Sequence, residues 1–159
     1  VNSVINILEY IGIKNIKYKW PNDIFIQNKK LAGILIETTI SRKTINEFII
    51  GIGINCVPKR IKNIKPVISL SELDCRVDAL KVFLLISFNI QLFMNTLNYI
   101  DYESISENLT KIFFSKKKPL TIDVSHNFYK GNFVKINSYG ELLIKEKNDI
   151  KIISYGEIL

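Results

Sequence analysis

The amino-acid sequence predicts an α+β fold in which a sheet with covering helices is followed by a small β-domain. Short β-rich runs separated by turn residues follow the N-terminal segment, and the last forty or so residues alternate with a period of two. From Leu80 to Leu97 the apolar residues recur with the i, i+3, i+4 spacing of a helix. The basic, proline-containing segment 116–119 breaks the helical pattern before the last strands. A length of 159 residues fits one domain with a small appendage. We therefore expect two domains, residues 1–117 and 118–159.

The first part opens with a short amphipathic helix over Val4–Ile11, and Gly12 stands where a glycine ends a helix. Strands should follow, because β-branched and aromatic runs are separated by turn residues such as Pro21-Asn22-Asp23. The expected strands cover residues 16–20, 24–27, 31–38 and 47–55. A polar loop with Pro58 and Pro66 comes next.

The middle of the chain is predicted to be helical. One turn is expected at 69–73, a long helix runs from Asp78 to Ile100, and a weaker helical pattern covers 104–114. The long helix should pack on the core through its apolar residues Leu80, Phe83, Leu84, Phe88, Leu92 and Leu97. Strands at 120–124, 133–136, 142–145 and 150–153, joined by Gly- and Asn-containing turns, predict a small β-barrel or sandwich at the end.

Composition excludes several classes of protein. An apolar fraction of 47% with 23% charged residues is typical of a globular chain, not a disordered or fibrous one. The net charge of +7 favours acidic partners, but the basic residues are scattered and no nucleic-acid recognition pattern accompanies them. The longest apolar stretch, 82–94, is shorter than the roughly 20 residues of a membrane span. Because no signal-peptide pattern opens the chain, we expect a cytoplasmic protein without membrane contact.

Metal and disulfide chemistry find little support in the sequence. Cys56 and Cys75 lie far apart without a CxxC spacing, and His126 has no ligand-like companion. We therefore predict reduced, partly buried thiols and no metal held by the protein's own side chains.

The strand predicted at 47–55 has two unlike faces. Alternation places Gly51, Gly53 and Asn55 on one face and isoleucines on the other. Two glycines on one face weaken a strand unless something approaches the backbone closely. The approaching group is either a ligand or a neighbouring helix, and the strand by itself does not decide between them.

A second unusual segment is Lys19-Trp20-Pro21-Asn22-Asp23, where proline ends a strand and leaves a lysine and a carboxylate at the strand end. Such ends host active sites, although a solvated strand face would also place Lys19 there. A third segment, Lys30-Leu31-Ala32-Gly33, puts another glycine on a strand that begins with lysine. Its spacing alone does not assign it a role.

Together these segments resemble a known family. The segments 19–23, 30–37 and 51–55, the last being Gly51-Ile52-Gly53-Ile54-Asn55, have the order and intervals found in the central and later part of the biotin–protein ligases. That family continues with a long helical segment and closes with an SH3-like β-domain, to which residues 131–158 are similar. The resemblance implies a partial class II synthetase-like catalytic sheet with helices, followed by a small SH3-like β-barrel.

The resemblance also implies a function. Biotin–protein ligases use ATP and Mg²⁺ to form biotinyl-5′-adenylate, and they then transfer the biotinyl group to a lysine of a biotin carboxyl carrier domain of a carboxylase. Carried over to this chain, the family implies that Lys19 touches the biotin carboxylate and the phosphate and that Lys30 faces the polyphosphate, both as catalytic residues. The implied substrate-binding residues are Lys19, Asp23, Gly33, Gly51, Gly53 and Asn55, with Asn55 on the nucleotide side.

One family feature is absent from the 159 residues. The Gly-Arg-Gly-Arg-x-Gly loop of the family lies N-terminal to the three segments. We therefore expect a chain that is inactive unless an N-terminal ligase half completes it, and whose exposed sheet edge allows a homodimer.

Two alternative functions stay open. The first is a non-catalytic module whose basic β-domain after Lys118 docks an acidic acceptor protein or a nucleic acid. The second is a lipoate ligase, which shares the catalytic fold.

Overall fold

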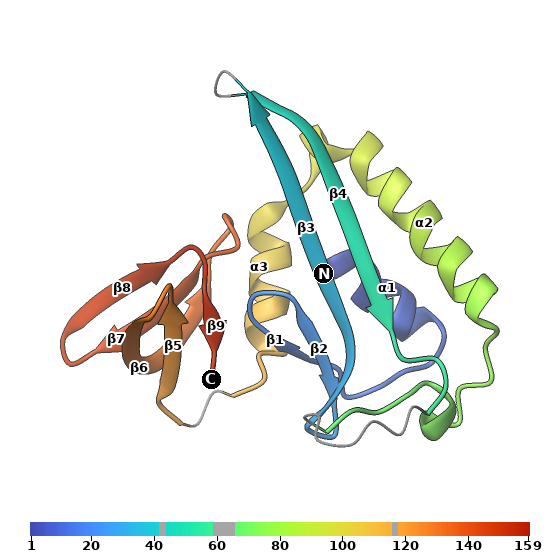
Figure 1. Cartoon of the computed structure of the whole chain (residues 1–159), viewed down its shortest axis with the longest axis horizontal. Helices are drawn as coiled ribbons and strands as arrows, with labels where there is room; N and C mark the ends of the chain where they lie inside the picture. The colour runs from blue at the N-terminus through green and yellow to red at the C-terminus, as the bar shows by residue number, and fades with distance from the viewer. Residues whose placement is uncertain (42–43, 59–65, 116–117) are drawn as a thin grey trace.

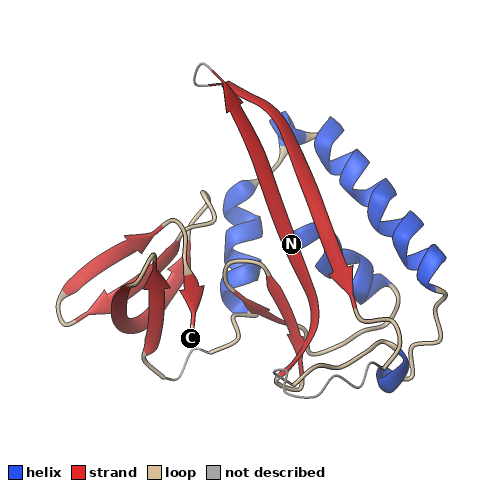
Figure 2. Cartoon of the chain, in the orientation of Figure 1, coloured by secondary structure: helices blue, strands red, loops and turns tan. Residues whose placement is uncertain are grey.

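The computed structural model describes residues 1–41, 44–58, 66–115 and 118–159 (Figure 1). They form two antiparallel sheets and three α-helices (Figure 2). The helices are α1 (Asn2–Tyr10), α2 (Ala79–Asn95) and α3 (Tyr102–Lys111), with 3₁₀ turns at Ser71–Leu73 and Leu97–Tyr99. The strands are β1 (Lys17–Lys19), β2 (Asp23–Ile26), β3 (Lys29–Ser41), β4 (Thr44–Ile54), β5 (Leu120–Val124), β6 (Asn127–Ile136), β7 (Leu142–Glu146), β8 (Asp149–Ile153) and β9 (Glu157–Ile158). The predicted mixture of helices and antiparallel strands is confirmed.

The first sheet has the strand order β1-β2-β3-β4 and is dominated by the long hairpin of β3 and β4. Helices α1 and α2 pack on one of its faces (Figure 1). The core between them contains fully buried Leu8, Ile24 and Leu31. Helix α1 ends as expected, because Gly12 adopts a φ of +94°, which favours glycine.

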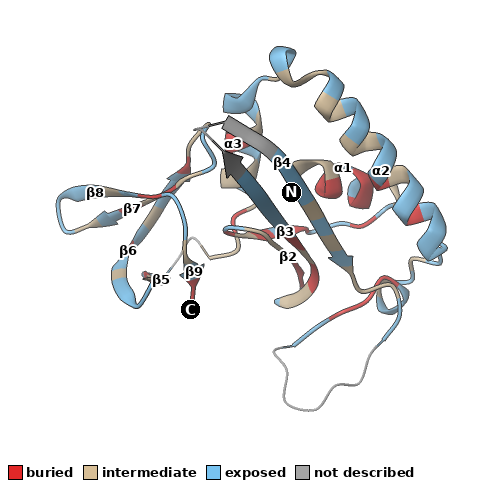
Figure 3. Cartoon of the chain, turned by 45° about the horizontal axis from the view of Figure 1, so that its top comes forward, coloured by how far each residue is buried: buried red, intermediate tan, exposed pale blue. Residues whose placement is uncertain are grey.

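The prediction for the core face of α2 is wrong. Leu80, Phe83, Leu84, Phe88 and Leu92 are between 51% and 69% exposed, whereas Val82 and Ile86 are buried (Figure 3). Apolar residues occur all around this helix, so their spacing could not identify the buried side. The described part of the chain therefore leaves an apolar stripe on the outside of α2.

The second sheet has the strand order β8-β7-β6-β5-β9 and its own buried residues, among them Ile122, Leu142 and Ile144. The core cluster of this sheet also includes Tyr18 of β1 and Trp20, which directly follows β1. The two sheets are therefore packed together at β1 and do not form isolated bodies. The domain boundary expected at 117/118 falls on residues 116–117, which lie outside the described residues.

Candidate functional site

A row of residues crosses the first sheet on one face. The strand register pairs Lys19 with Asp23, Asp23 with Gly33, and Gly33 with Gly53. Directly opposed residues of antiparallel strands point to the same face, so Lys19, Asp23, Gly33 and Gly53 lie side by side. The structure thus brings together four of the predicted site residues from four different strands.

The opposite face of the same strands is the core. Tyr18, Ile24 and Ala32 have 3% exposure or less and alternate with the row. The row faces away from the core, over a shallow hollow of about 390 Å³ bordered by Asn22, Leu35 and the glycines. A larger hollow of about 490 Å³ lies on the core side against α2 and α3, but neither of the two predicted catalytic lysines lines it.

Lys30 reaches the open face through a β-bulge. The register of β2 and β3 shifts so that Ile24 pairs with Ala32 but Phe25 pairs with Lys30, which leaves Leu31 as the extra residue. Leu31 and Ala32 are consequently both buried, with 0% and 2% exposure. The Lys30 side chain is turned to the face of Gly33, where its Nζ atom lies 2.6 Å from Oδ1 of Asp23.

This ion pair lies close to the backbone of Gly33. A Cβ atom at Gly33 would lie 3.1 Å from both Oδ1 of Asp23 and Nζ of Lys30. The amine and the carboxylate therefore rest directly over the backbone of β3.

Gly51 and Gly53 have a different environment. A Cβ atom at Gly51 would meet only Leu35, at 3.8 Å, and one at Gly53 would meet only the Gly33 carbonyl, at 4.0 Å. Among the described residues no helix packs on these glycines, so the helix-packing interpretation of them is wrong. Their side of the sheet is a bare backbone surface, which is suited to a flat ligand.

The second sheet borders the site at its other end. Lys19, Asp23 and Lys30 line a hollow of about 350 Å³ together with Gly156 and Glu157, which precede and begin β9. Sequence reasoning missed these two residues, because segment 156–158 was assigned only to the β-domain. Its similarity to the family's closing segment was the signal that could have identified them.

Two buried aromatic residues hold the segment 19–23 in place. The Tyr18 hydroxyl donates to the carbonyl oxygen of Pro21 at 2.7 Å, and Nε1 of Trp20 donates to the carbonyl oxygen of Gly140 at 3.0 Å. Burial raises the pKa of the Tyr18 phenol well above its usual range, and the charge of Asp23 adds to this effect. Lys19 is thus flanked by two anchored side chains.

Asn55 does not continue the glycine face. It follows the end of β4, and its Nδ2 atom donates to the carbonyl oxygens of Lys30 at 3.1 Å and Ile68 at 3.2 Å. Both hydrogens of the amide are therefore directed to the backbone. Only the Oδ1 atom of Asn55 therefore remains for the nucleotide contact that the family resemblance implies.

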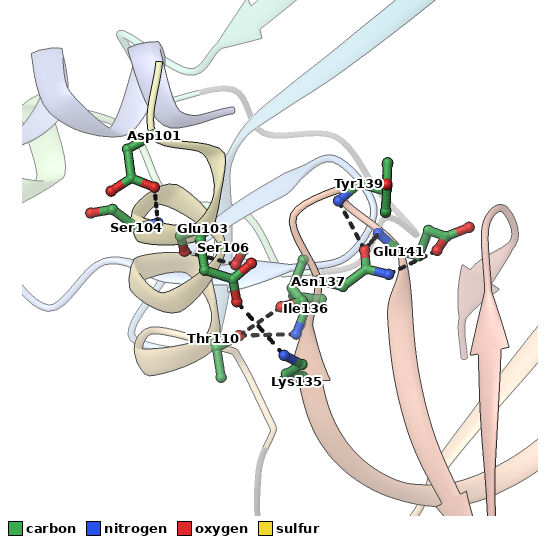
Figure 4. A network of polar contacts seen from close by, with 10 residues as sticks. All are labelled: Asp101, Glu103, Ser104, Ser106, Thr110, Lys135, Ile136, Asn137, Tyr139 and Glu141. Atoms are coloured by element: carbon green, nitrogen blue, oxygen red, sulfur yellow. Dashed lines mark hydrogen bonds and ion pairs between the residues drawn. The ribbon is translucent and has the colours of Figure 1, made fainter. Parts of the chain in front are cut away.

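A polar network joins α3 to the second sheet (Figure 4). Oγ1 of Thr110 accepts a hydrogen bond from the Ile136 N–H at 2.9 Å, and Lys135 lies 3.7 Å from Glu103. The side-chain oxygen of Asn137 accepts from the N–H of Glu141 in the turn that carries Gly140. The first two contacts hold β6 against α3, and the third shapes the β6–β7 turn.

Metal-binding and thiol chemistry do not stand out at this site. Within the described ranges no three His, Cys, Asp or Glu side chains are grouped as metal ligands. Cys56 and Cys75 are half-buried free thiols, and burial raises the pKa of Cys56. In the same described parts of the chain, no helix combines the length and the apolar character needed to cross a membrane.

Comparison with known proteins finds similar sequences for the first third of the chain and similar folds for almost all of it. Residues 2–55 match the Biotin/lipoate A/B protein ligase family. The sequence of this first third of the chain is thus similar to that of the biotin and lipoate ligases. The Bifunctional ligase/repressor BirA of Escherichia coli is 39% identical over 56 residues, which are 35% of this chain and 17% of BirA. BirA of Bacillus subtilis is 48% identical over 52 residues, which are 33% of this chain and 16% of that protein.

Solved structures of biotin protein ligases share the fold of almost the whole chain. The Aquifex aeolicus ligase in complex with biotin and ATP superposes with a TM-score of 0.81 and 24% identity, over 99% of this chain and 67% of the ligase. Another crystal structure of the Aquifex ligase gives a TM-score of 0.82 with 25% identity, over 99% of this chain and 70% of the ligase. The chain thus spans about two thirds of these ligase structures, and its sequence matches cover less than a fifth of BirA.

Proposed function

We propose that this chain carries the ligand face of a biotin protein ligase and takes part in a two-step reaction. In the first step an oxygen of the biotin carboxylate attacks the α-phosphorus of ATP, so that biotinyl-5′-adenylate forms and pyrophosphate leaves. In the second step a lysine amine of a biotin carboxyl carrier domain attacks the biotinyl carbonyl, and AMP leaves. The observation that carries the proposal is the row Lys19, Asp23, Gly33 and Gly53, with the Lys30 amine on the same face.

The proposed roles follow from charge and shape. Adenylation concentrates negative charge on the α-phosphate, and amines held at strand ends stabilise it. Lys19 would contact the biotin carboxylate and the α-phosphate, and Lys30 would leave Asp23 to contact the polyphosphate. The bare backbone at Gly51 and Gly53 would lie against the ligand, because nothing closer than 3.8 Å occupies the space beside it.

Magnesium fits this site as a companion of the triphosphate. Mg²⁺ is usually held by one or two carboxylates together with phosphate oxygens and water. Asp23 and Glu157 line the same hollow as the two lysines and are suitable carboxylates. When bound, the ion neutralises charge on the phosphates and polarises them.

The proposal also assigns two domains to the chain and an acceptor protein to the reaction. Residues 1–117 would form the partial catalytic domain and residues 118–159 an SH3-like domain that borders the nucleotide end through Glu157. The acceptor would be a biotin carboxyl carrier domain, as the family resemblance implies, and the similarity to BirA, a ligase by name, supports ligase chemistry. The alternative of a basic docking module is not favoured, since residues 118–159 hold six lysines against five carboxylates.

The direct test is adenylate formation. An N-terminal ligase half that carries the Gly-Arg-Gly-Arg-x-Gly loop is fused in front of this chain, and the fusion is incubated with biotin and ATP labelled at the α-phosphate. We expect labelled biotinyl-adenylate, and we expect Lys30→Ala to reduce its rate by about 100- to 1000-fold. Lys29→Ala, which removes the neighbouring lysine, is the matched control and should leave the rate unchanged. A folded fusion that makes no adenylate would contradict the proposal.

A further inference from the structure

The first sheet has one covered edge and one open edge. At β1 the Tyr18 N–H donates to the Ile112 carbonyl oxygen at 2.9 Å, and the Tyr18 carbonyl oxygen accepts from the Phe114 N–H at 2.8 Å. At the opposite edge, in the described part of the chain, no segment other than β3 bonds to the backbone of β4. Proteins usually protect a long edge strand with lysine, proline or a bulge, but residues 48–54 have none of these. We therefore expect a partner strand at this edge.

The free backbone groups of β4 belong to alternate residues. Ile34 of β3 is paired with Ile52 but directs its N–H away from β4, to the Asn22 carbonyl oxygen at 3.0 Å. The two residues of such a pair share no hydrogen bond, so Ile52 turns its own N–H and carbonyl group to the free edge. Because antiparallel pairs alternate and the register has no shift over this stretch, Ile50 and Phe48 have the same orientation. These residues offer the bonds that an added strand needs.

Helix α2 supplies an apolar surface beside this edge. It packs against α1 and lies beyond β4, on the side away from β3, in both Figure 1 and Figure 3. Ile90 and Met94 of α2 line the hollow of about 490 Å³ together with Ile50 and Ile52 of β4. Phe83 lies on the same flank of the helix, about two turns before Ile90, and is 63% exposed. A strand added to β4 would extend the sheet over this flank, and its inward side chains would cover the hollow.

The other face of an added strand would extend the proposed ligand site. The row Lys19, Asp23, Gly33 and Gly53 ends at β4, which is the last strand of the described sheet. A residue opposite Gly53 on a further strand would point to the same face. The partner strand would thus place its side chains beside the bare backbone of Gly51 and Gly53.

We infer that the free edge of β4 and the adjoining flank of α2 are a docking surface for a strand of the N-terminal ligase half, which pairs with β4 and carries side chains into the ligand site. The identity of this partner rests on the proposed function, whereas the open edge and the apolar flank do not. The chain spans 67% and 70% of the two Aquifex ligase structures, so about a third of each has no counterpart in it. A second copy fits the surface less well. Antiparallel pairing of two β4 strands keeps all helices on one face, so each α2 would meet the α1 of the other copy.

The first experiment locates the bound partner on β4. The 159-residue chain is co-expressed with the N-terminal ligase half used for the fusion, which carries an affinity tag, and amide hydrogen exchange is followed by NMR. We expect the amides of Phe48, Ile50 and Ile52 to exchange at least about tenfold more slowly in the complex than in the chain alone. The amides of Ile49 and Gly51, which face β3, are the internal control and should be slow in both samples.

Three results would overturn the inference. One is the absence of a complex, and another is a complex in which the edge amides exchange as fast as in the chain alone. The third is slow exchange of these amides in the chain alone, together with a dimer in sedimentation equilibrium, which would assign the edge to a second copy.

The second experiment tests the flank of α2. Phe83→Glu places a charge on the docking surface, and Phe128→Glu is the matched control, because Phe128 of β6 is also 63% exposed. Each variant competes with the unsubstituted chain for the tagged half during co-expression, and mass spectrometry gives their ratio in the purified complex. Phe83→Glu should bind about 10- to 100-fold more weakly and Phe128→Glu less than about twofold, since only the first loses the burial of a phenylalanine. Should Phe83→Glu fail to fold, Phe83→Ala should bind about tenfold more weakly. Equal losses at the two positions would overturn the inference.

The inference and the proposed function can fail separately. A complex with slow edge amides that forms no biotinyl-adenylate would support the docking surface and contradict the proposed function. Adenylate formation by a fusion whose edge amides exchange freely would support the function and overturn the docking surface.

Discussion

Trp20, the single tryptophan of the chain, donates its Nε1 hydrogen to the carbonyl oxygen of Gly140 across 3.0 Å. The two residues are 120 positions apart in sequence, and Trp20 follows β1 of the first sheet whereas Gly140 lies between β6 and β7 of the second. Trp20 directly follows Lys19 and is 2% exposed. The bond therefore connects the β6–β7 turn of the second sheet to the lysine-bearing end of β1.

Replacing Trp20 by phenylalanine tests this connection. The change keeps an aromatic ring in the core but removes the hydrogen bond and some packing, so we expect the free energy of unfolding to fall by about 1–3 kcal/mol. Urea unfolding followed by circular dichroism measures it. Tyr139→Phe, in the same turn but 88% exposed, should change stability by less than about 0.5 kcal/mol. Equal effects of the two changes would contradict the structural role of the bond.

Tyr18 should make the protein sensitive to alkaline pH. The unfolded chain releases the phenol proton near its ordinary pKa of 10.0, but burial, together with the charge of Asp23, raises the pKa of the folded form. Above pH 10 the unfolded state consequently binds fewer protons than the folded state, so the free energy of unfolding falls as pH rises. The contribution is fully present below pH 10 and decreases by at most about 1.4 kcal/mol per pH unit above it.

The check is thermal unfolding between pH 8 and pH 11.5. Tyr18→Phe should lose about 1 kcal/mol below pH 10 through the missing bond to Pro21, and its stability should then fall less steeply at high pH. Tyr10→Phe, at a residue 76% exposed, should keep the slope of the unsubstituted chain. A slope that is the same in all three proteins would refute the assignment to Tyr18.

Glycines with bare and crowded surroundings should respond differently to alanine. At Gly51 a Cβ atom has only ordinary contact with Leu35, whereas at Gly131 it would lie 2.8 Å from the Lys145 carbonyl oxygen. We expect Gly51→Ala to leave the free energy of unfolding within about 1 kcal/mol, and Gly131→Ala to lower it by about 1–3 kcal/mol. In the fused ligase, Gly51→Ala should nevertheless slow adenylate formation, because the methyl group occupies the ligand's side of the sheet. Normal activity of Gly51→Ala would place the ligand elsewhere.

Substitutions on the two sides of α2 should differ in their effect on the free energy of unfolding. Ile86 is 5% exposed and Phe88 is 69% exposed. Ile86→Ala should lower the free energy of unfolding by about 2–5 kcal/mol, and Phe88→Ala should change it by about 0.5 kcal/mol or less. Urea unfolding of the two variants measures both values. A large loss for Phe88→Ala would mean that the outer stripe of the helix is covered.

Local patterns predicted most elements to within a few residues, because turn residues and apolar alternation act locally. The strands at 120–124 and 142–145, the glycine end of α1 and the alternation of Gly51 and Gly53 with isoleucines were all predicted in this way. The hairpin of β3 and β4 is longer than predicted, since residues 39–41 and 44–46 continue the pairing without a marked apolar pattern. The predicted core face of α2 is wrong, because apolar residues lie all around this helix and their spacing does not show which side is buried.

The sequence by itself determined the family resemblance, the strand that bears the glycines and the two lysines as candidates, since these depend on residue types in a fixed order. Only the tertiary structure decided that Lys19, Asp23, Gly33 and Gly53 form one row, because strand register is set by pairing between strands. It also decided that Lys30 turns to that row through a bulge, and that the amide of Asn55 bonds to the backbone. These features depend on contacts between distant segments, and no local pattern of residues encodes them.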